Sequence, residues 1–191
     1  MNVSLSEVVD ILRPRNLCPD YEFNSVADIT PELLVRVGMV KAVAYDGDST
    51  LYAHGRVELD ETVRSAFEGI VSYLGRDKVC IISNTTKERM ALLEQSLGVR
   101  VIRTRQKKPA REPFEAALSY FGTAPEETLM VGDRLMTDVA GANRVGFRTA
   151  RVKPLHPASQ PFGVRVARRF EDLVYAAYNT YGDCLDFFNF S

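Results

Sequence analysis

The sequence has no tryptophan, few cysteines and histidines, and almost no net charge. Its three cysteines, Cys18, Cys80 and Cys184, are far apart and lack CxxC spacing. This argues against both a disulfide framework and a zinc site, and it indicates a reducing compartment. The formal net charge of −1 provides no overall basic field, so we expect no nucleic-acid partner.

Long apolar runs are also absent. No window approaches about 18 uninterrupted apolar residues, the length that suggests a membrane-spanning helix. The N-terminus lacks the basic-then-apolar pattern of a secretory signal. The sequence therefore predicts a cytoplasmic protein with no transmembrane segment. Peripheral contact with a membrane stays open.

The 191 residues are 46% hydrophobic and 26% charged, which suits one soluble domain with its own core. Short apolar runs predict strands at residues 40–45, 79–82, 99–102, 128–131 and 147–152. Helical spacing of apolar residues separates them at 63–74, 90–97, 114–121 and 135–145. This alternation is typical of a parallel sheet covered on both faces. The predicted fold class is a three-layer α/β/α, Rossmann-like fold.

Three parts are expected along the chain: a helical lead-in packed on the domain, the catalytic α/β domain, and a loop followed by a C-terminal helix and tail of the same domain (residues 1–39, 40–153 and 154–191). In the lead-in, Thr30 is a predicted N-cap and Gly38 a helix stop. In the last part, residues 154–163 read as loop. A final amphipathic helix around residues 170–178 is expected to follow it.

Polar residues follow the predicted strands at the edge of the sheet where open parallel sheets bind ligands. Asp46 and Asp48 follow the first strand, Ser83 the second and Asp133 the fourth. Lys108 lies at a helix start after the third strand. Every strand with a clear end thus delivers residues suited to binding phosphate or metal. The sequence predicts that they meet in one site.

Asp46 and Asp48 are placed for phosphoryl transfer. Two carboxylates separated by one small residue can crowd around a hard cation, and Mg²⁺ prefers oxygen ligands. We predict that Asp46 attacks phosphorus and forms an aspartyl-phosphate. Asp48 is predicted to protonate the leaving oxygen and then to deprotonate the attacking water.

The remaining site residues are assigned to phosphate and metal binding. Ser83, Asn84 and Lys108 are predicted to hold the other phosphate oxygens. Asp133 and Asp138 are predicted to complete the Mg²⁺ site, although Asp138 also suits charge stabilisation of a first helical turn.

These residues match a known pattern. The combination of Asp46-x-Asp48-x-Thr50, Ser83, Lys108-Pro109 and Gly132-Asp133-x₄-Asp138 resembles the haloacid dehalogenase (HAD) superfamily of phosphatases over about residues 40–152. More narrowly, residues 132–144 and the segment Asp28-Ile29-Thr30-Pro31 resemble its branch of mitochondrial and bacterial phosphatidylglycerophosphate phosphatases.

The resemblance implies roles for individual residues. Asp46 is the nucleophile, Asp48 the general acid and base, and Asp46, Asp133 and the backbone carbonyl of Asp48 hold Mg²⁺. Thr50 and Thr137 would support the site, Thr137 being equally suited to a structural role. This chain departs from the branch in having Gly47 and Ser49, where a bulky residue and an asparagine are usual.

The spacing of the motifs leaves no room for a cap domain. The stretch between Asp48 and Ser83 holds one predicted helix, and the stretch between Ser83 and Lys108 holds one helix and a strand. We therefore expect a capless site open to solvent. Such a site suits a phosphate carried on a protein, a nucleic-acid end or a lipid headgroup at a bilayer.

The leading hypothesis is a Mg²⁺-dependent phosphatase that converts phosphatidylglycerophosphate to phosphatidylglycerol. A capless phosphatase for a soluble phosphomonoester or a phosphoprotein is the alternative. A receiver-like signalling module is disfavoured because its phosphorylated aspartate would follow a later strand than the acidic pair. An inactive binding module is disfavoured because Asp46 and Asp48 are both retained.

Several residues keep two interpretations. His54 follows the first motif, where it suits a solvated loop better than substrate contact. Arg165, Arg168 and Arg169 suit a solvated helix face or contact with anionic lipid headgroups. The aromatic stretch 175–190 suits packing or a membrane contact.

Overall fold

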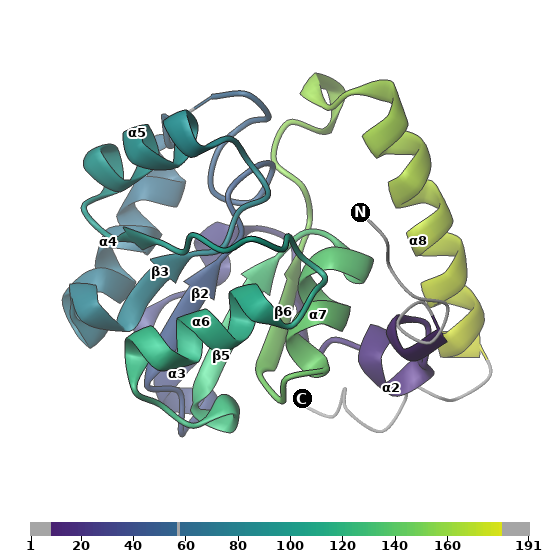
Figure 1. The fold of residues 1–191 in the computed structure, drawn as a ribbon, viewed down its shortest axis with the longest axis horizontal. Coiled ribbons are helices and arrows are strands. Elements are labelled where there is room, and N and C mark those ends of the chain that lie inside the picture. The colour runs from purple at the N-terminus through teal and green to yellow at the C-terminus, as the bar shows by residue number, and fades with distance from the viewer. Residues whose placement is uncertain (1–8, 57, 181–191) are drawn as a thin grey trace.

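The computed structural model describes residues 9–56 and 58–180. Within them, a parallel sheet has the strand order β1-β6-β5-β2-β3-β4 (Figure 1). The strands are β1 (Tyr21–Phe23), β2 (Ala42–Tyr45), β3 (Val79–Ile81), β4 (Arg100–Val101), β5 (Thr128–Gly132) and β6 (Arg148–Val152). The predicted α/β class with a parallel sheet is confirmed.

The α-helices are α2 (Pro14–Leu17), α3 (Pro31–Val37), α4 (Glu61–Leu74), α5 (Lys87–Leu97), α6 (Glu112–Phe121), α7 (Ala140–Asn143) and α8 (Phe162–Thr180). The side chain of Thr30 accepts a hydrogen bond from the Leu33 N–H and caps α3, which ends at Gly38 as expected. Gly75, Gly98 and Gly122 likewise follow the ends of α4, α5 and α6.

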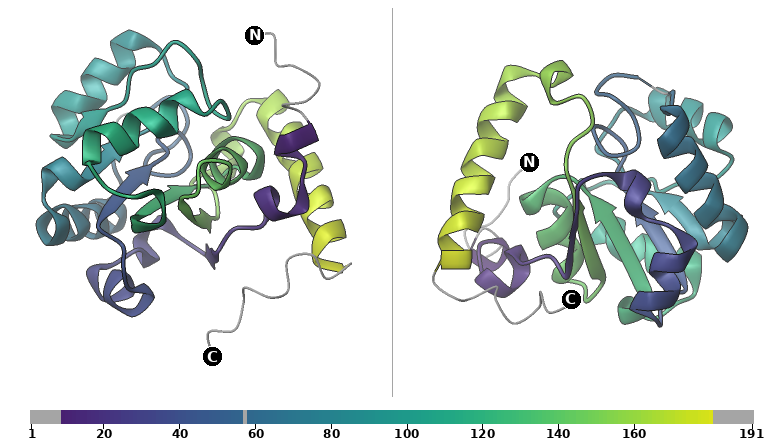
Figure 2. Two further views of the ribbon diagram at one scale, coloured as in Figure 1. Left: turned by 60° about the horizontal axis from the view of Figure 1, so that its bottom comes forward. Right: turned by 180° about the vertical axis from the view of Figure 1, so that it is seen from behind.

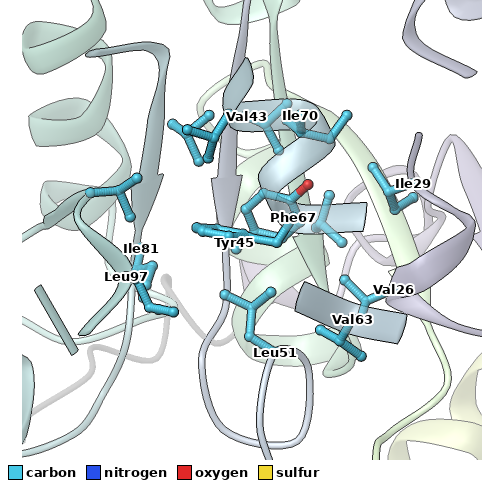
Figure 3. Packing of buried hydrophobic residues seen from close by; sticks show 14 of the residues in the cluster. Val26, Ile29, Val43, Tyr45, Leu51, Val63, Phe67, Ile70, Ile81 and Leu97 are labelled. Carbon is cyan, nitrogen blue, oxygen red and sulfur yellow. The ribbon is translucent and has the colours of Figure 1, made fainter. Parts of the chain in front are cut away.

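The alternation of side chains along β2 divides the core into two layers. Val43 and Tyr45 belong to a cluster with residues of α4 and α5, such as Phe67. Figure 3 shows the Tyr45 and Phe67 rings together. Their centroids are 5.6 Å apart. Ala42 and Ala44 face the other way, into a cluster with Phe114 of α6. Helices therefore cover both faces of the sheet, as a three-layer fold requires.

The lead-in is not purely helical, contrary to expectation. Tyr21–Phe23 forms β1 and pairs in parallel with β6, so this segment extends the sheet. A strand of three partly exposed residues is too short to give an alternating pattern, which is why the sequence did not reveal it.

Two boundaries after β5 also differ from the prediction. The expected helix over 135–145 consists of a π-helical turn at Leu135–Val139 followed by the short α7. The final helix begins at Phe162, not near residue 170, so the arginines expected to precede it lie inside α8. Pro161 fits a helix start because its missing N–H would have no helical partner there.

The two cysteines within the described residues differ in whether they form a disulfide. Cys80 is a free, buried thiol, and burial raises its pKa far above the usual range. Cys18, however, is disulfide-bonded, so the expectation of no disulfide is wrong for this residue. The argument from cysteine usage for a reducing compartment is therefore lost.

Helix α8 lies at the margin of the molecule, away from α4 and α5 (Figures 1 and 2). Tyr175 anchors it in a small apolar cluster with Leu17 of α2 and Leu135 of the π-helical turn. None of the described helices is long and apolar enough to cross a membrane.

Candidate active site

Two neighbouring strands bring the first pair of acids together. Tyr45 of β2 is in register with Val131 of β5, and the Asp46 N–H donates to the Val131 carbonyl at 2.8 Å. Asp46 and Asp133 therefore lie side by side just beyond the carboxyl ends of β2 and β5. Asp138, on the π-helical turn, adds a third carboxylate. All three are buried, and oxygens from each lie within 4.8 Å of one another.

Lys108 reaches this acid cluster from the loop before α6. Its Nζ lies 2.5 Å from Asp46 Oδ1 and 2.7 Å from Asp138 Oδ1, and its side chain is almost fully buried. Asn84 fixes the backbone at this point. Its Oδ1 accepts from the Lys108 N–H at 2.9 Å, and its Nδ2 donates to the Lys108 carbonyl at 3.0 Å. Asn84 thus holds the lysine in position with the side-chain atoms that were predicted to hold phosphate.

The cluster carries an excess of negative charge. Burial raises the pKa of Asp46, the Asp138 and Asp133 carboxylates raise it further, and Lys108 opposes them. Burial also raises the pKa of Asp133, which Arg168 partly offsets. Three buried carboxylates face two cationic groups, Lys108 and Arg168, so the cluster still favours the uptake of a further cation.

The predicted supporting threonines contact the acids directly. Thr50 Oγ1 donates to Asp133 Oδ1 at 3.2 Å, and Thr137 Oγ1 donates to Asp138 Oδ1 at 3.2 Å. The backbone N–H of Arg134 donates to Asp138 Oδ2 at 3.0 Å. These bonds fix the orientation of two of the three carboxylates before any ligand binds.

Asp48 occupies a different position from Asp46. Its carboxylate forms an ion pair with Arg89 of α5 at 2.8 Å and accepts from the Gly55 N–H at 3.2 Å. His54 Nδ1 lies 3.8 Å from the same carboxylate. The structure therefore keeps the Asp48 side chain at the rim of the site, outside the group of three carboxylates. Only its backbone carbonyl stays a candidate metal ligand.

A cleft of about 210 Å³ extends from the buried strand-end acids Asp46 and Asp133, which form its floor, to Asp48 at its rim. It contains the five residues on which the sequence prediction rested, together with residues of α8. The lining residues are Asp46, Asp48, Ser49, His54, Ser83, Asn84, Lys108, Asp133, Arg134, Thr137, Val164 and Arg168. The strand-end residues thus converge on one cleft, whereas Thr50 lies beneath it, fully buried.

Arg168 is a site residue that the sequence prediction left open. It enters the cleft from α8, where Nη1 donates to the Asp133 carbonyl at 2.8 Å and Nη2 pairs with the Asp133 carboxylate. Arg89 is a second residue at the site, and no pattern in the sequence indicated it. Both lie on helices, and only the packing of those helices shows that they reach the strand ends.

The local structure explains why Gly47 stands where the resembled branch usually has a bulky residue. A Cβ atom on Gly47 would lie 1.9 Å from the hydroxyl oxygen of Tyr52. The tyrosine ring therefore occupies the space that a side chain at position 47 would need. Tyr52 is buried, and the centroid of its ring lies 5.1 Å from the Arg89 guanidinium carbon.

The donor set fits a hard divalent cation. Asp46, Asp133 and Asp138 offer only carboxylate oxygens, the ligand type that Mg²⁺ prefers, and lie close enough to share one ion. The same floor presents Lys108 and Ser83, a positive charge and a hydroxyl suited to phosphate oxygens.

Comparison with known proteins identifies the family of this chain. The family described as mitochondrial PGP phosphatase matches residues 2–154. Phosphatidylglycerophosphate phosphatase 1 of Arabidopsis thaliana, chloroplastic/mitochondrial, is 34% identical over 87% of this chain and 50% of its own length. The chloroplastic enzyme of the same name from Chlamydomonas reinhardtii is 33% identical over 74% of this chain and 55% of its own length. This chain thus spans about half the length of these two relatives.

Two further comparisons involve bacterial and archaeal proteins. The probable phosphatase YqeG of Bacillus subtilis is 31% identical over 86% of this chain and 92% of its own length. A solved HAD phosphatase from Thermococcus onnurineus is 16% identical, with a TM-score of 0.44, over 75% of this chain and 99% of that one. On the family match and the three sequence relatives, this chain belongs to the mitochondrial PGP phosphatase family.

Proposed function

We propose that this chain is a Mg²⁺-dependent phosphatase that hydrolyses a phosphomonoester through an aspartyl-phosphate on Asp46, with phosphatidylglycerophosphate as its substrate. One observation carries the proposal. The Asp46 carboxylate lies in an open cleft, 2.5 Å from the Lys108 ammonium and beside two further buried carboxylates. This supports the proposal because a carboxylate suited to attack, a cation suited to phosphate and two acids suited to metal binding lie together.

In the first step, an Asp46 carboxylate oxygen attacks the phosphorus atom while the bond from phosphorus to the substrate oxygen breaks. Asp48, at the rim, gives its proton to that leaving oxygen. Lys108 and Ser83 bind the non-bridging phosphate oxygens and thereby offset their charge.

In the second step, Asp48 takes a proton from a water molecule, whose oxygen attacks the phosphorus of the aspartyl-phosphate. The phosphorus–Asp46 oxygen bond breaks, which releases inorganic phosphate and restores the carboxylate. Arg89, paired with Asp48, keeps this carboxylate facing the cleft during both steps.

Asp46, Asp133 and Asp138 would hold the magnesium ion, together with the Asp48 carbonyl. When bound, the ion supplies positive charge that offsets repulsion between the Asp46 carboxylate and the phosphate. The acid cluster supports this part of the proposal because its burial raises the pKa of Asp46 and of Asp133 in the absence of a metal.

The choice of substrate rests on the relatives named as phosphatidylglycerophosphate phosphatases and on the open rim of the cleft. We assign catalysis to residues 40–153, with the described parts of the lead-in and of the C-terminal segment, residues 9–39 and 154–180, packed around them. Residues 1–8 and 181–191 of these two parts lie outside the described residues. A cytoplasmic location, peripheral to a membrane, is also part of the proposal.

The test is a phosphate-release assay on phosphatidylglycerophosphate in mixed micelles and on soluble phosphomonoesters. We expect faster release from the lipid, loss of release in EDTA and recovery with added Mg²⁺. Asp46→Asn should reduce release at least about a thousandfold, because the nucleophile is lost. Hydrolysis without metal would refute the mechanism, and a preference for soluble sugar or nucleotide phosphates would refute the lipid assignment.

A further inference from the structure

Helix α8 carries an exposed apolar stripe. Phe162, Val166, Phe170 and Leu173 are each between 51% and 75% exposed. Their spacing of four, four and three residues places them on one face of the helix. Single exposed apolar residues are ordinary on protein surfaces, but four on one helical face form a continuous patch.

The opposite face of α8 is fixed to the protein. Buried Glu171 accepts a hydrogen bond from Arg134 Nε at 2.9 Å and another from the Leu135 N–H at 2.9 Å. Tyr175, one turn further, is buried in the cluster near α2. These contacts orient the helix so that the apolar stripe faces outward.

The charges of α8 leave a net positive border along the stripe. Its two acids are neutralised, since Glu171 pairs with Arg134 and Asp172 pairs with Arg151. Arg168 pairs with Asp133 in the cleft. The two remaining arginines, at positions 165 and 169, are exposed and form no ion pair within residues 9–56 and 58–180. Each directly precedes a residue of the stripe.

The stripe lies close to the candidate site. Val164 and Arg168, on the inner side of the same helix, line the cleft beside Asp133. One helix with its side chains is about 10–12 Å across. A surface that contacts the stripe would therefore come within about one helix diameter of the cleft.

We propose that the apolar stripe of α8, with Arg165 and Arg169 along its border, docks the protein on an anionic lipid bilayer. The helix would lie in the plane of the interface, with its apolar face among the acyl chains and its arginines among the headgroup phosphates. This inference deepens the proposed function and rests on it for its purpose, since docking would bring the cleft to a substrate that stays in the membrane.

The decisive measurement is co-sedimentation of the full chain with two kinds of vesicle, one of phosphatidylcholine alone and one containing phosphatidylglycerol as well. We expect wild-type protein to bind the anionic vesicles more tightly. Phe170→Ser combined with Leu173→Ser should weaken that binding at least about tenfold, because two apolar side chains no longer enter the bilayer. Arg165→Gln combined with Arg169→Gln should reduce binding to the anionic vesicles only.

A matched control changes exposed apolar residues elsewhere. Val35 on α3 and Leu92 on α5 are 64% and 55% exposed, and their serine variants should bind vesicles like wild type. Equal vesicle binding by the Phe170→Ser/Leu173→Ser variant and wild type would overturn the proposal. So would self-association of wild type, seen by analytical ultracentrifugation without lipid and abolished in that variant, because the stripe would then join two copies.

Activity separates this proposal from the proposed function. The Phe170→Ser/Leu173→Ser variant should hydrolyse the soluble ester p-nitrophenyl phosphate at the wild-type rate, while its rate on vesicle-borne phosphatidylglycerophosphate falls. Vesicle binding by a wild-type protein with no phosphatase activity would support docking and refute the proposed function. Phosphatase activity in a wild-type protein that does not bind vesicles would support the proposed function and refute docking.

Discussion

The floor and the rim of the cleft are built differently. On the floor, Asp46 and Asp133 end two paired strands and are almost fully buried. At the rim, Asp48 is partly exposed and held by Arg89 of α5, while Arg168 arrives from α8. The hydrogen bonds of the sheet determine the floor, whereas the packing of separate helices determines the rim.

This difference divides the chemistry. The floor concentrates negative charge where water is scarce, which suits the binding of a metal ion and the nucleophilic attack. The rim keeps its acid in contact with solvent, where proton exchange with water is easy. Two aspartates only two residues apart can therefore take different roles because their surroundings differ.

Among changes that leave the nucleophile Asp46 in place, the largest effect should come from disabling the acid of the rim. Asp48→Asn should lower the rate of phosphate release by a factor of about 10² to 10⁴, the usual contribution of general acid–base catalysis. Arg89→Met should lower it less, because Asp48 is then present but no longer held. Steady-state assays on phosphatidylglycerophosphate in mixed micelles would measure both, because its alkoxide leaving group needs a proton that a p-nitrophenolate leaving group does not.

Lys87→Met is the matched control for Arg89→Met. It removes a positive charge from the exposed start of the same helix and should leave the rate unchanged. A near-wild-type rate in Asp48→Asn would show that the rim takes no part in proton transfer and would remove the contrast between the two regions.

A smaller effect is expected where floor and rim meet, at Gly47. Gly47→Ala should lower the free energy of unfolding by about 1–3 kcal/mol, because the new methyl group overlaps the Tyr52 hydroxyl. Adding Tyr52→Leu should recover part of the loss, because it removes that oxygen. Urea denaturation of the single and double variants measures this coupling.

Gly69→Ala on α4 is the control for this substitution. Its Cβ would meet only Pro31 at an ordinary 3.7 Å, so we expect unchanged or slightly higher stability. If Gly47→Ala were as stable as wild type, the loop at 47–52 would be free to adjust. The Tyr52 ring would then not be the reason for a glycine at position 47.

The smallest effect concerns the charge of the floor. The pKa of Asp46 and that of Asp133 are raised in the metal-free fold, so protonation stabilises this fold relative to the unfolded chain. This contribution is complete below about pH 4, where an unperturbed aspartate titrates, and is lost as the pH rises through the raised values. Mg²⁺ should offset the loss, because it binds the ionised carboxylates.

Thermal unfolding with and without MgCl₂ would test this. At a tenfold excess over its Kd, Mg²⁺ should add about 1.4 kcal/mol, or roughly 3–5 °C in Tm. The gain should be larger at pH 8 than at pH 5 and should shrink in Asp133→Asn, with KCl of equal ionic strength as the blank. Equal gains at both pH values would contradict a cation site formed by these carboxylates.

Sequence patterns succeeded where a local feature has a local cause. The apolar run before Asp46 predicted a buried strand, and glycines marked the ends of α4, α5 and α6 correctly. The patterns failed for β1, which is too short to show a period, and for the start of α8. They also missed the π-helical turn that carries Asp138, because its spacing resembles that of an ordinary helix.

The site followed the same rule. Asp46, Ser83, Lys108 and Asp133 were predictable because parallel strands place their carboxyl ends at one edge of the sheet. Arg89, the ion-pair partner of Asp48, could not be predicted, because nothing in the nearby sequence distinguishes it from other arginines on helix surfaces. Arg168 appeared only as one of three arginines with two possible roles.

By itself, the sequence determined the parallel α/β fold, the strand-end acids and the lysine that meets them, because hydrophobic periodicity and strand polarity are properties of short segments. Only the tertiary structure decided which carboxylates share a cluster, which arginines reach the cleft, and which face of α8 stays exposed. These depend on the orientation of separate helices relative to the sheet, and contacts between residues far apart in the chain set that orientation.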